Sequence, residues 1–233
     1  KNLQDGMKGS LLGYKDSSDL IRKELIENNI NFTEMSFDEI VEFSAKYLSK
    51  GNAIGWYQNK MEFGPRALGS RSILADPRNP EMQKKLNLSV KFRESFRPFA
   101  PIILKDKLNE WFDLNCDSPY MGIVTTLKED KIISNKDDQN GLKKINNIRS
   151  LVPSITHVDY SARIQTIDKR YNSEIYSLLE KFNEITNVPI LVNTSFNLSN
   201  EPIVNSVLDA YKTFLVSDLE ILVCDNFIIR KNI

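Results

Sequence analysis

The sequence predicts an α/β protein in which helices and strands alternate along the chain. Segments with apolar residues at three- and four-residue spacing alternate along the chain with short apolar runs, as helices and strands alternate in α/β domains. The chain has 233 residues, of which 41% are hydrophobic, and shows neither an internal repeat nor an evident linker. We therefore expect one large domain with a substantial core and a sheet that is at least partly parallel.

Two helices are expected before the first strand. Apolar spacing indicates a helix over 17–29, which begins behind a serine cap, and a second over 37–51, which ends at Gly51. We interpret residues 1–51 as a helical lead-in segment that packs on a domain formed by residues 52–233.

The central part of the chain predicts shorter elements. Residues 52–58 indicate a strand that runs into the stretch 60–80, where Gly-Pro and Asp-Pro dipeptides break regular structure. The next expected elements are a helix over 81–90, an extended segment over 97–104, a helix over 105–114 and a buried strand over 121–127. Residues 128–147 are polar and rich in Asn, Asp and Lys, so we expect a surface excursion and the place most prone to disorder.

The C-terminal part returns to strict alternation. It predicts a strand over 155–167, a helix over 173–187, a buried strand with a polar end over 188–197, a helix over 205–218, and one strand or a hairpin over 219–231.

The composition excludes several classes of protein. Lys plus Arg and Asp plus Glu both number 31, so no overall field attracts nucleic acid or anionic lipid. Cys116 and Cys224 lie far apart without a CxxC motif, which indicates core cysteines, no zinc site and a reducing, cytoplasmic compartment. The apolar runs are far shorter than the roughly 20 residues that cross a bilayer, so no membrane association is expected.

Positive charge gathers locally even though the whole chain is neutral. Between Lys60 and Arg97, nine basic residues accompany four acidic ones, a net charge of +5. We expect solvated side chains at Lys60, Arg78, Lys84 and Lys85, as is usual for charge runs.

Four arginines in this region lie in segments interrupted by Gly or Pro: Arg66, Arg71, Arg93 and Arg97. Two of them, Arg66 and Arg97, directly adjoin a proline. A constrained backbone can aim a planar guanidinium at a phosphate or carboxylate. Gly64 and Gly69 would let the main chain approach an anion and donate N–H groups to it. The stretch therefore predicts an anion site.

Four sequence blocks in order carry a family resemblance. They are MEFGPRALGSRSILADPR at 61–78, LNLSVKFRESFRPFAP at 86–101, HVDYSARIQT at 157–166 and PILVNTSFNLSNEPIV at 189–204. These blocks resemble the C-terminal domain of the O-carbamoyltransferases named after nodulation proteins and after cephamycin and tobramycin carbamoylation. The resemblance covers residues 52–204.

The resemblance implies a YrdC-like fold, an open, twisted, mixed sheet with flanking helices around a positively charged cavity. There carbamoyl phosphate and ATP would give carbamoyl adenylate and pyrophosphate, with a Mg²⁺ ion held largely by phosphates and water. In the family, an actin-like N-terminal domain with a bound metal, Fe²⁺ or similar, passes the carbamoyl group to a hydroxyl of a sugar or natural product. The chain matches only the C-terminal portion, so the resemblance implies the adenylate-forming half-reaction, with that N-terminal domain as its partner.

Motif positions imply the site residues. Joining a carbamate oxygen to an α-phosphorus brings polyanions together, so positioned cations must offset their repulsion. By resemblance, the catalytic cations are Arg66, Lys91, Arg97 and Arg163. The implied ligands of ATP and carbamoyl phosphate are Arg66, Arg71, Lys91, Arg93, Arg97, Arg163, Asn193, Thr194, Ser195 and Asn197. No metal ligand from this chain is implied.

Structural interpretations stand beside these roles. Arg97 could pair with Glu94 or Glu62, and residues 193–197 could form only a polar cap at a strand end. His157, the only histidine, is interpreted as a hydrogen-bonded structural residue. Phe96, Phe99 and Trp111 are expected in the core, although an aromatic ring near the pocket could stack on adenine.

The sequence departs from the family in HVDYSAR, and it leaves the function open in part. Tyr160 replaces the usual glycine and Ser161 the usual threonine, so we expect a narrower pocket or a changed turn. Two other functions share the fold: an RNA-binding module, which the neutral total charge disfavours, and a threonylcarbamoyl-adenylate synthase, which would need bicarbonate and threonine. The carbamoyl acceptor is not indicated.

Overall fold

The computed structural model describes residues 6–133 and 148–231. Its strands are β1 (Thr33–Glu34), β2 (Ala53–Tyr57), β3 (Arg71–Ala75), β4 (Ala100–Leu104), β5 (Ile123–Thr126), β6 (Ser161–Ile167), β7 (Ile190–Ser195), β8 (Ile221–Cys224) and β9 (Phe227–Arg230). The helices are α1 (Ser18–Glu27), α2 (Phe37–Leu48), α3 (Met82–Ser89), α4 (Leu108–Trp111), α5 (Ser173–Thr186) and α6 (Val207–Val216). Short 3-10 turns are η1 (Lys8–Ser10), η2 (Lys105–Lys107), η3 (Glu129–Lys131) and η5 (Pro153–Ile155).

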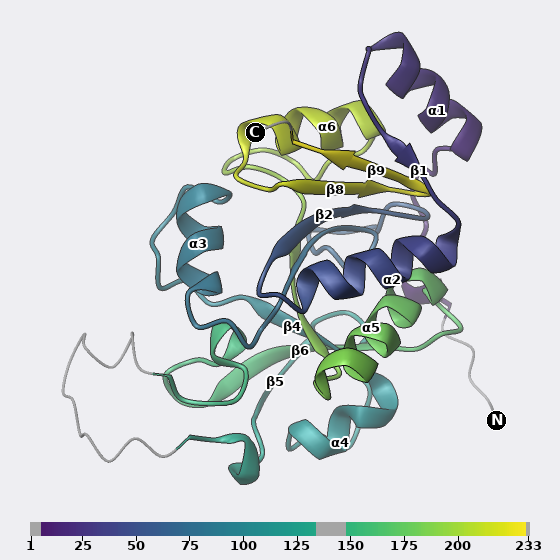
Figure 1. The fold of residues 1–233 in the computed structure, drawn as a ribbon. Helices are drawn as coiled ribbons and strands as arrows, with labels where there is room; N and C mark the ends of the chain where they lie inside the picture. Colours follow the sequence, from purple (N-terminus) through teal and green to yellow (C-terminus); the bar gives the residue numbers. More distant parts are fainter. Residues whose placement is uncertain (1–5, 134–147, 232–233) are drawn as a thin grey trace.

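One sheet unites all these strands in the order β1-β9-β8-β2-β3-β7-β4-β6-β5. The pairs β2–β8 and β4–β6 are parallel, and the other pairs are antiparallel. This open, mixed sheet with flanking helices confirms the predicted α/β class (Figure 1).

Helix caps account for where the helices begin. The Ser17 side chain accepts from Leu20 N at the start of α1, and Ser36 and Glu39 form a capping box at α2. Ser206 and Asp209 form a second capping box at α6. These local signals are why the expected helices over 17–29, 37–51 and 205–218 are confirmed.

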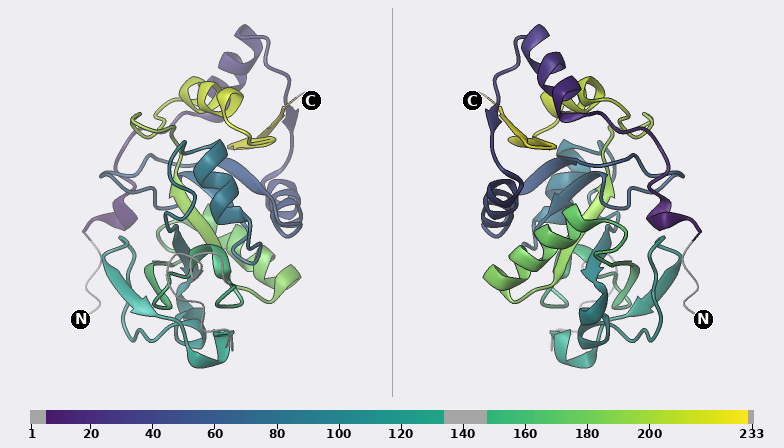
Figure 2. Two further views of the ribbon diagram at one scale, coloured as in Figure 1. Left: turned by 90° about the vertical axis from the view of Figure 1, so that its left-hand side faces the viewer. Right: turned by 90° about the vertical axis from the view of Figure 1, so that its right-hand side faces the viewer.

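The core lies on both sides of the central strands. Every residue of β2, β3 and β4 is buried, and α2 and α5 pack side by side on the same face of the sheet (Figures 1 and 2). The N-terminal segment passes along the opposite side in both views of Figure 2. Its backbone pairs with the segment after β2, because Gly13 N donates to Met61 O at 2.9 Å and Phe63 N donates to Ser10 O at 2.7 Å. No helix among the described residues has the length and apolar character needed to cross a membrane.

Several expectations about individual elements were wrong. The stretch 60–80 contains a buried central strand, β3. It was not expected, because its uncharged part is only the four residues Ser-Ile-Leu-Ala, with charged residues on both sides. Strand β5 lies at the sheet edge with alternate residues exposed, rather than buried, and β1 was not expected at all. The open choice over 219–231 resolves as the β8–β9 hairpin.

Of the aromatic and cysteine side chains that were expected in the core, only some are buried. Phe99 and Trp111 are buried, whereas Phe96 is 53% exposed. Cys224 is buried and Cys116 is exposed, so the prediction of a core cysteine was wrong for Cys116. Of the predicted polar excursion, residues 134–147 lie outside the described part of the chain.

Arg71 lies in the core rather than at the surface. Its side chain is fully buried, and its guanidinium donates to Gln58 O at 2.7 Å and to Asn59 O at 3.2 Å. It also donates to Tyr14 O at 3.4 Å and lies 3.6 Å from the centre of the Tyr57 ring. Arg71 therefore ties the N-terminal segment to the segment that follows β2.

Replacing Arg71 by leucine should destabilise the fold. The Arg71→Leu variant leaves several buried carbonyl groups without a donor, so the free energy of unfolding should fall by about 3 kcal/mol or more. Urea unfolding followed by circular dichroism measures this change. The matched control is Arg170→Leu, which breaks an exposed pair with Asp168 and should cost less than about 1 kcal/mol. Equal small losses in both variants would contradict a structural role for Arg71.

Candidate functional site

A buried glutamate shapes the loop between β2 and β3. Glu62 is 3% exposed, and its carboxylate accepts backbone N–H groups from Leu68 at 2.7 Å, Ser70 at 2.6 Å and Arg71 at 3.1 Å. Charge-assisted bonds to main-chain N–H groups are strong, and three of them on one carboxylate draw the chain into a closed loop. The loop over 62–71 is therefore held from inside by its own first residue.

The carbonyl groups of the same loop are held from the sheet. Asn193 Nδ2 donates to Ala67 O at 3.1 Å, and Gln165 Nε2 donates to Leu68 O at 2.8 Å. Gly69 has φ of +102°, and a Cβ there would come within 3.1 Å of the Ile175 side chain on α5. Only glycine satisfies both the left-handed backbone and this close approach.

This bonding corrects the prediction that the main chain at Gly69 donates to an anion. The N–H groups of Leu68, Ser70 and Arg71 are taken by Glu62, and Gly69 N donates to Ser72 Oγ at 3.1 Å. What the loop presents is the exposed Arg66 side chain.

A pocket lies beside this loop and above one face of the sheet. Register places Asn193 of β7 opposite Ala100 of β4, and both residues line the pocket. Arg163 projects from β6, two residues from Gln165 and so on the same face. The complete lining is Pro65, Arg66, Ala67, Arg93, Pro98, Phe99, Ala100, Met121, Arg163, Asn193, Thr194 and Ser195.

The charged lining residues of this arginine pocket are all cations. Arg66, Arg93 and Arg163 come from three separate segments, and within the described ranges none of them takes part in a salt bridge. Burial lowers the pKa of Arg163, and the nearby charge of Arg66 lowers it further. Burial and the charge of Arg97 likewise lower the pKa of Arg93, against a smaller opposing effect of Glu94. An anion in the pocket would relieve both repulsions.

Lys91 supports the rim of the arginine pocket from behind. Its side chain is 5% exposed, and Nζ donates to Ser195 O, to Ser195 Oγ at 3.2 Å and to Asn197 Oδ1 at 2.7 Å. Ser195 Oγ in turn donates to Asn197 Oδ1 at 2.7 Å. Burial, assisted by the charge of Arg93, lowers the pKa of Lys91 to about 7. Lys91 is therefore a cation that changes charge near neutral pH.

The structure brings most of the implied site residues together. Six line the arginine pocket: Arg66, Arg93, Arg163, Asn193, Thr194 and Ser195. Lys91 and Asn197 adjoin it through Ser195. Arg97 is exposed and outside the lining, without a salt bridge to Glu94 or Glu62, and Arg71 lies in the core.

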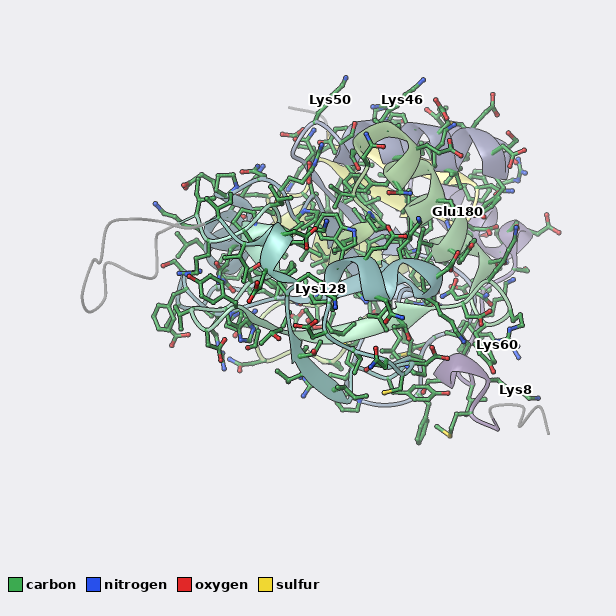
Figure 3. All side chains as sticks on the ribbon, turned by 90° about the horizontal axis from the view of Figure 1, so that it is seen from below. Lys8, Lys46, Lys50, Lys60, Lys128 and Glu180 are labelled. Carbon is green, nitrogen blue, oxygen red and sulfur yellow. The ribbon has the colours of Figure 1, made fainter. Side chains whose placement is uncertain are left out.

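Of the four basic side chains that were expected to be solvated, three are exposed and one is half-buried. Lys60 is exposed and projects outward in Figure 3, and Lys84 and Lys85 are also exposed. Arg78 is instead half-buried and pairs with Asp76 at 2.6 Å.

A second, more apolar pocket shares Pro98 with the arginine pocket. It is lined by Gln83, Phe96, Pro98, Arg149, Thr156, His157 and Val158. Phe96 and Val158 are 53% and 58% exposed, so this wall offers apolar surface to a ligand. His157 is half-buried, its Nδ1 lies 3.4 Å from Ser161 Oγ, and burial lowers its pKa. The expected hydrogen bonding of His157 is present, and its ring also faces this second pocket.

Tyr160 keeps the turn that a glycine would favour. Its φ is +63°, in the left-handed region, and its N–H donates to His157 O at 3.0 Å. Tyr160 is not among the residues that line either pocket. The expected narrowing of the pocket by Tyr160 is therefore not seen, and Tyr160 adopts a left-handed turn conformation that a glycine could also adopt.

Glu62 and Gln165 complete the site, and sequence reasoning missed their roles. Glu62 was expected only as a possible partner of Arg97, and no sequence pattern marks a glutamate that accepts N–H groups from residues 6, 8 and 9 positions further along. Within residues 6–133 and 148–231, no group of three or more His, Cys, Asp or Glu side chains is placed to hold a metal ion.

Comparison with known proteins assigns the chain to a family. Residues 45–231 match the family model described as the carbamoyltransferase C-terminus. The chain is 39% identical to nodulation protein NolNO of Sinorhizobium fredii over 99% of its length and 42% identical to nodulation protein NolO of Bradyrhizobium diazoefficiens over 83%. The chain belongs to the carbamoyltransferase C-terminal family.

These relatives are much longer than the chain. The alignments cover 32% of NolNO and 33% of NolO, and an uncharacterized protein of Synechocystis, 44% identical over 97% of the chain, is covered over 38%. The chain thus spans about a third of the length of these relatives. In a crystal structure of full-length HypF in the phosphate- and nucleotide-bound form, 21% of that chain aligns with 81% of this one, with a TM-score of 0.48 and 14% identity.

The three hydrogen bonds by which Glu62 holds the loop over 62–71 form a clamp, the Glu62 clamp, and loosening it should weaken anion binding. Glu62→Gln replaces one acceptor oxygen by an NH₂ group that faces backbone donors, so Arg66 should lose its position and pyrophosphate affinity should fall about tenfold or more. Simple electrostatics predicts the opposite sign, because the substitution removes a negative charge near the pocket. Isothermal titration calorimetry decides between the two. Glu94→Gln, at an exposed acid near Arg93, is the control and should not lower affinity.

The pKa of Lys91 should make anion binding depend on pH. Above pH 7 the free protein holds Lys91 largely neutral, so binding an anion that favours the charged form requires proton uptake. The ratio of wild-type to Lys91→Met affinity for pyrophosphate should then fall by up to about tenfold per pH unit above 7. Titrations of both proteins between pH 6 and 9 cancel the ionisation of pyrophosphate itself. A ratio that stays constant from pH 7 to 9 would show that Lys91 keeps its proton.

Proposed function

We propose that the chain binds ATP and carbamoyl phosphate in the arginine pocket and forms carbamoyl adenylate. The observation that carries this proposal is the convergence of Arg66, Arg93 and Arg163 without an acidic residue in the pocket lining. Arg66 is exposed and Arg93 and Arg163 are half-buried. Cations that converge without counterions favour a ligand of high negative charge, and guanidinium groups fit phosphate oxygens in pairs. Membership of the carbamoyltransferase C-terminal family supports the carbamoyl group as the second part of the substrate.

The reaction must release two phosphate-containing products. Water first cleaves carbamoyl phosphate to carbamate and phosphate, and a carbamate oxygen then attacks the α-phosphorus of ATP. A new bond forms between that oxygen and the α-phosphorus. The bond between the α-phosphorus and the oxygen that bridges to the β-phosphorus breaks, and pyrophosphate leaves with its electron pair. Both steps bring anions into contact and spread charge over phosphoryl oxygens, which positioned cations stabilise. No side chain needs to exchange a proton with the α-phosphoryl group.

We assign separate tasks to the residues of the pocket. Arg66 and Arg163, whose charges repel one another, would hold the phosphoryl oxygens between them. Ser195, at the end of β7, would bind a phosphate oxygen at the rim, where open α/β sheets usually hold ligands. Lys91 would keep Ser195 and Asn197 in place and add its charge when an anion is bound.

The second pocket suits the base of the nucleotide. It meets the arginine pocket at Pro98, and its exposed Phe96 and Val158 offer apolar surface beside the half-buried His157 ring. A nucleobase needs flat apolar contact more than charge. A Mg²⁺ ion would arrive with the phosphates of ATP and remain bound largely by them and by water.

Transfer of the carbamoyl group to an acceptor would involve the remainder of a longer protein. The chain spans about a third of the length of its relatives, and the implied actin-like domain with its bound metal would lie in the rest. We propose that this domain receives the adenylate and passes the carbamoyl group to a hydroxyl of a sugar or natural product.

Pyrophosphate exchange tests the proposal. With carbamoyl phosphate, ATP and Mg²⁺, the chain should exchange labelled pyrophosphate into ATP, because adenylate formation is reversible. Arg66→Ala should lower the exchange rate about 100-fold or more, because it removes a cation from the transition state. Lys60→Ala, at an exposed residue outside both pockets, is the matched control and should exchange at the wild-type rate.

Two outcomes would contradict the proposal in different ways. Absence of exchange together with absence of ATP binding in calorimetry would rule out the nucleotide site. Exchange that requires bicarbonate and threonine in place of carbamoyl phosphate would instead identify a threonylcarbamoyl-adenylate synthase.

A further inference from the structure

One buried polar atom of a residue that lines the arginine pocket has no partner. Asn193 is 1% exposed and lines the pocket from β7. Its Oδ1 atom forms no hydrogen bond, one of only a few buried side-chain atoms in the described ranges for which this is so. Buried acceptors are almost always paired in native proteins, so an orphaned one at a ligand pocket indicates what a ligand brings.

The hydrogen-bond network fixes which way the Asn193 amide faces. Nδ2 donates to two oxygens, Ala67 O at 3.1 Å and Gln165 Oε1 at 2.7 Å. The Gln165 amide is fixed in turn, because its Nε2 donates to Leu68 O at 2.8 Å. A flipped Asn193 would set its oxygen against these two acceptors. The orientation with Oδ1 unpaired is therefore the one that the network selects.

The rest of the pocket offers the opposite chemistry. The guanidinium groups of Arg66, Arg93 and Arg163 are donors only, and they suit the oxygens of phosphate. The acceptor Asn193 Oδ1 cannot form a hydrogen bond with an unprotonated phosphate oxygen. The lone pairs of Oδ1 would likewise repel a carboxylate. Oδ1 suits a ligand that carries an N–H group next to its anionic part.

The carbamoyl group has this arrangement. Its amino group carries two N–H donors and is bonded to the carbonyl carbon. In carbamoyl phosphate that carbon bears the phosphate oxygen, and in carbamate it bears the oxygen that attacks ATP. The residues that flank Asn193 in the lining include Ala67 and Ala100, whose single methyl groups leave room for a small group of this size. Acetyl phosphate has the same shape with a methyl group in place of the amino group, and it cannot donate to Oδ1.

We propose that Asn193 Oδ1 accepts a hydrogen bond from the amino group of the carbamoyl substrate and so selects it over acyl phosphates that lack an N–H group. This inference rests on the proposed function, because it names the substrate group that the same pocket recognises. A site built to pair with a substrate N–H group discriminates against the analogue without it, since the buried acceptor then stays unpaired.

Binding of two matched ligands tests the inference. In the wild-type chain, the dissociation constant of acetyl phosphate should exceed that of carbamoyl phosphate by about tenfold or more. In Asn193→Leu, which has the same number and branching of heavy side-chain atoms and no acceptor, the two constants should become nearly equal. The control is Asn52→Leu, which removes an amide that donates to Tyr47 O outside the arginine pocket and should keep the wild-type ratio.

The outcomes separate this inference from the proposed function. If the wild-type chain binds neither acyl phosphate, the proposed function fails. If it binds both equally, or if folded Asn193→Leu keeps the preference for carbamoyl phosphate, the proposed function stands and the role of Asn193 is wrong. If circular dichroism shows that Asn193→Leu is unfolded, the wild-type ratio of the two dissociation constants and a crystal structure with carbamoyl phosphate decide. In that structure the amino nitrogen of carbamoyl phosphate must lie within about 3.2 Å of Asn193 Oδ1.

Discussion

The clamp that Glu62 places on the loop over 62–71 is the constraint on which the rest of the site depends. Its carboxylate gathers the N–H groups of Leu68, Ser70 and Arg71, while Asn193 and Gln165 hold the carbonyl groups of Ala67 and Leu68 from the sheet. Residues 67–71 of the loop therefore have little backbone freedom left. Arg66 directly precedes this held segment, which limits where its side chain can reach.

The clamp also explains why a neutral protein tolerates a cluster of unpaired cations. The one buried carboxylate of the loop is directed at main-chain N–H groups, so it does not neutralise Arg66 or Arg163. Burial, and then the nearby charge of Arg66, lower the pKa of Arg163, so the charged form of Arg163 is disfavoured in the absence of a ligand. We infer that a polyanion stabilises that charged form when it binds.

The sequence predicted the α/β class and nearly every helix, because caps and apolar spacing are local signals. It did not predict β3, whose strand character comes from pairing with β2 on one side and β7 on the other. Motif positions placed Arg66, Arg163 and Ser195 together, but they could not show that Arg71 turns into the core towards Tyr57. The Glu62 clamp joins residues only 6, 8 and 9 positions apart, but no local sequence pattern marks it. The unpaired Asn193 oxygen could not be predicted, because it depends on contacts between distant segments.

A crystal structure of the chain with Mg²⁺ and a non-hydrolysable ATP analogue tests the central claim most directly. The phosphate chain should lie in the arginine pocket, with oxygens within about 3.2 Å of the Arg66 and Arg163 guanidinium groups and of Ser195, and the base should lie near Phe96 and His157. A nucleotide bound anywhere else, or phosphates that leave Arg66 and Arg163 without contact, would contradict it.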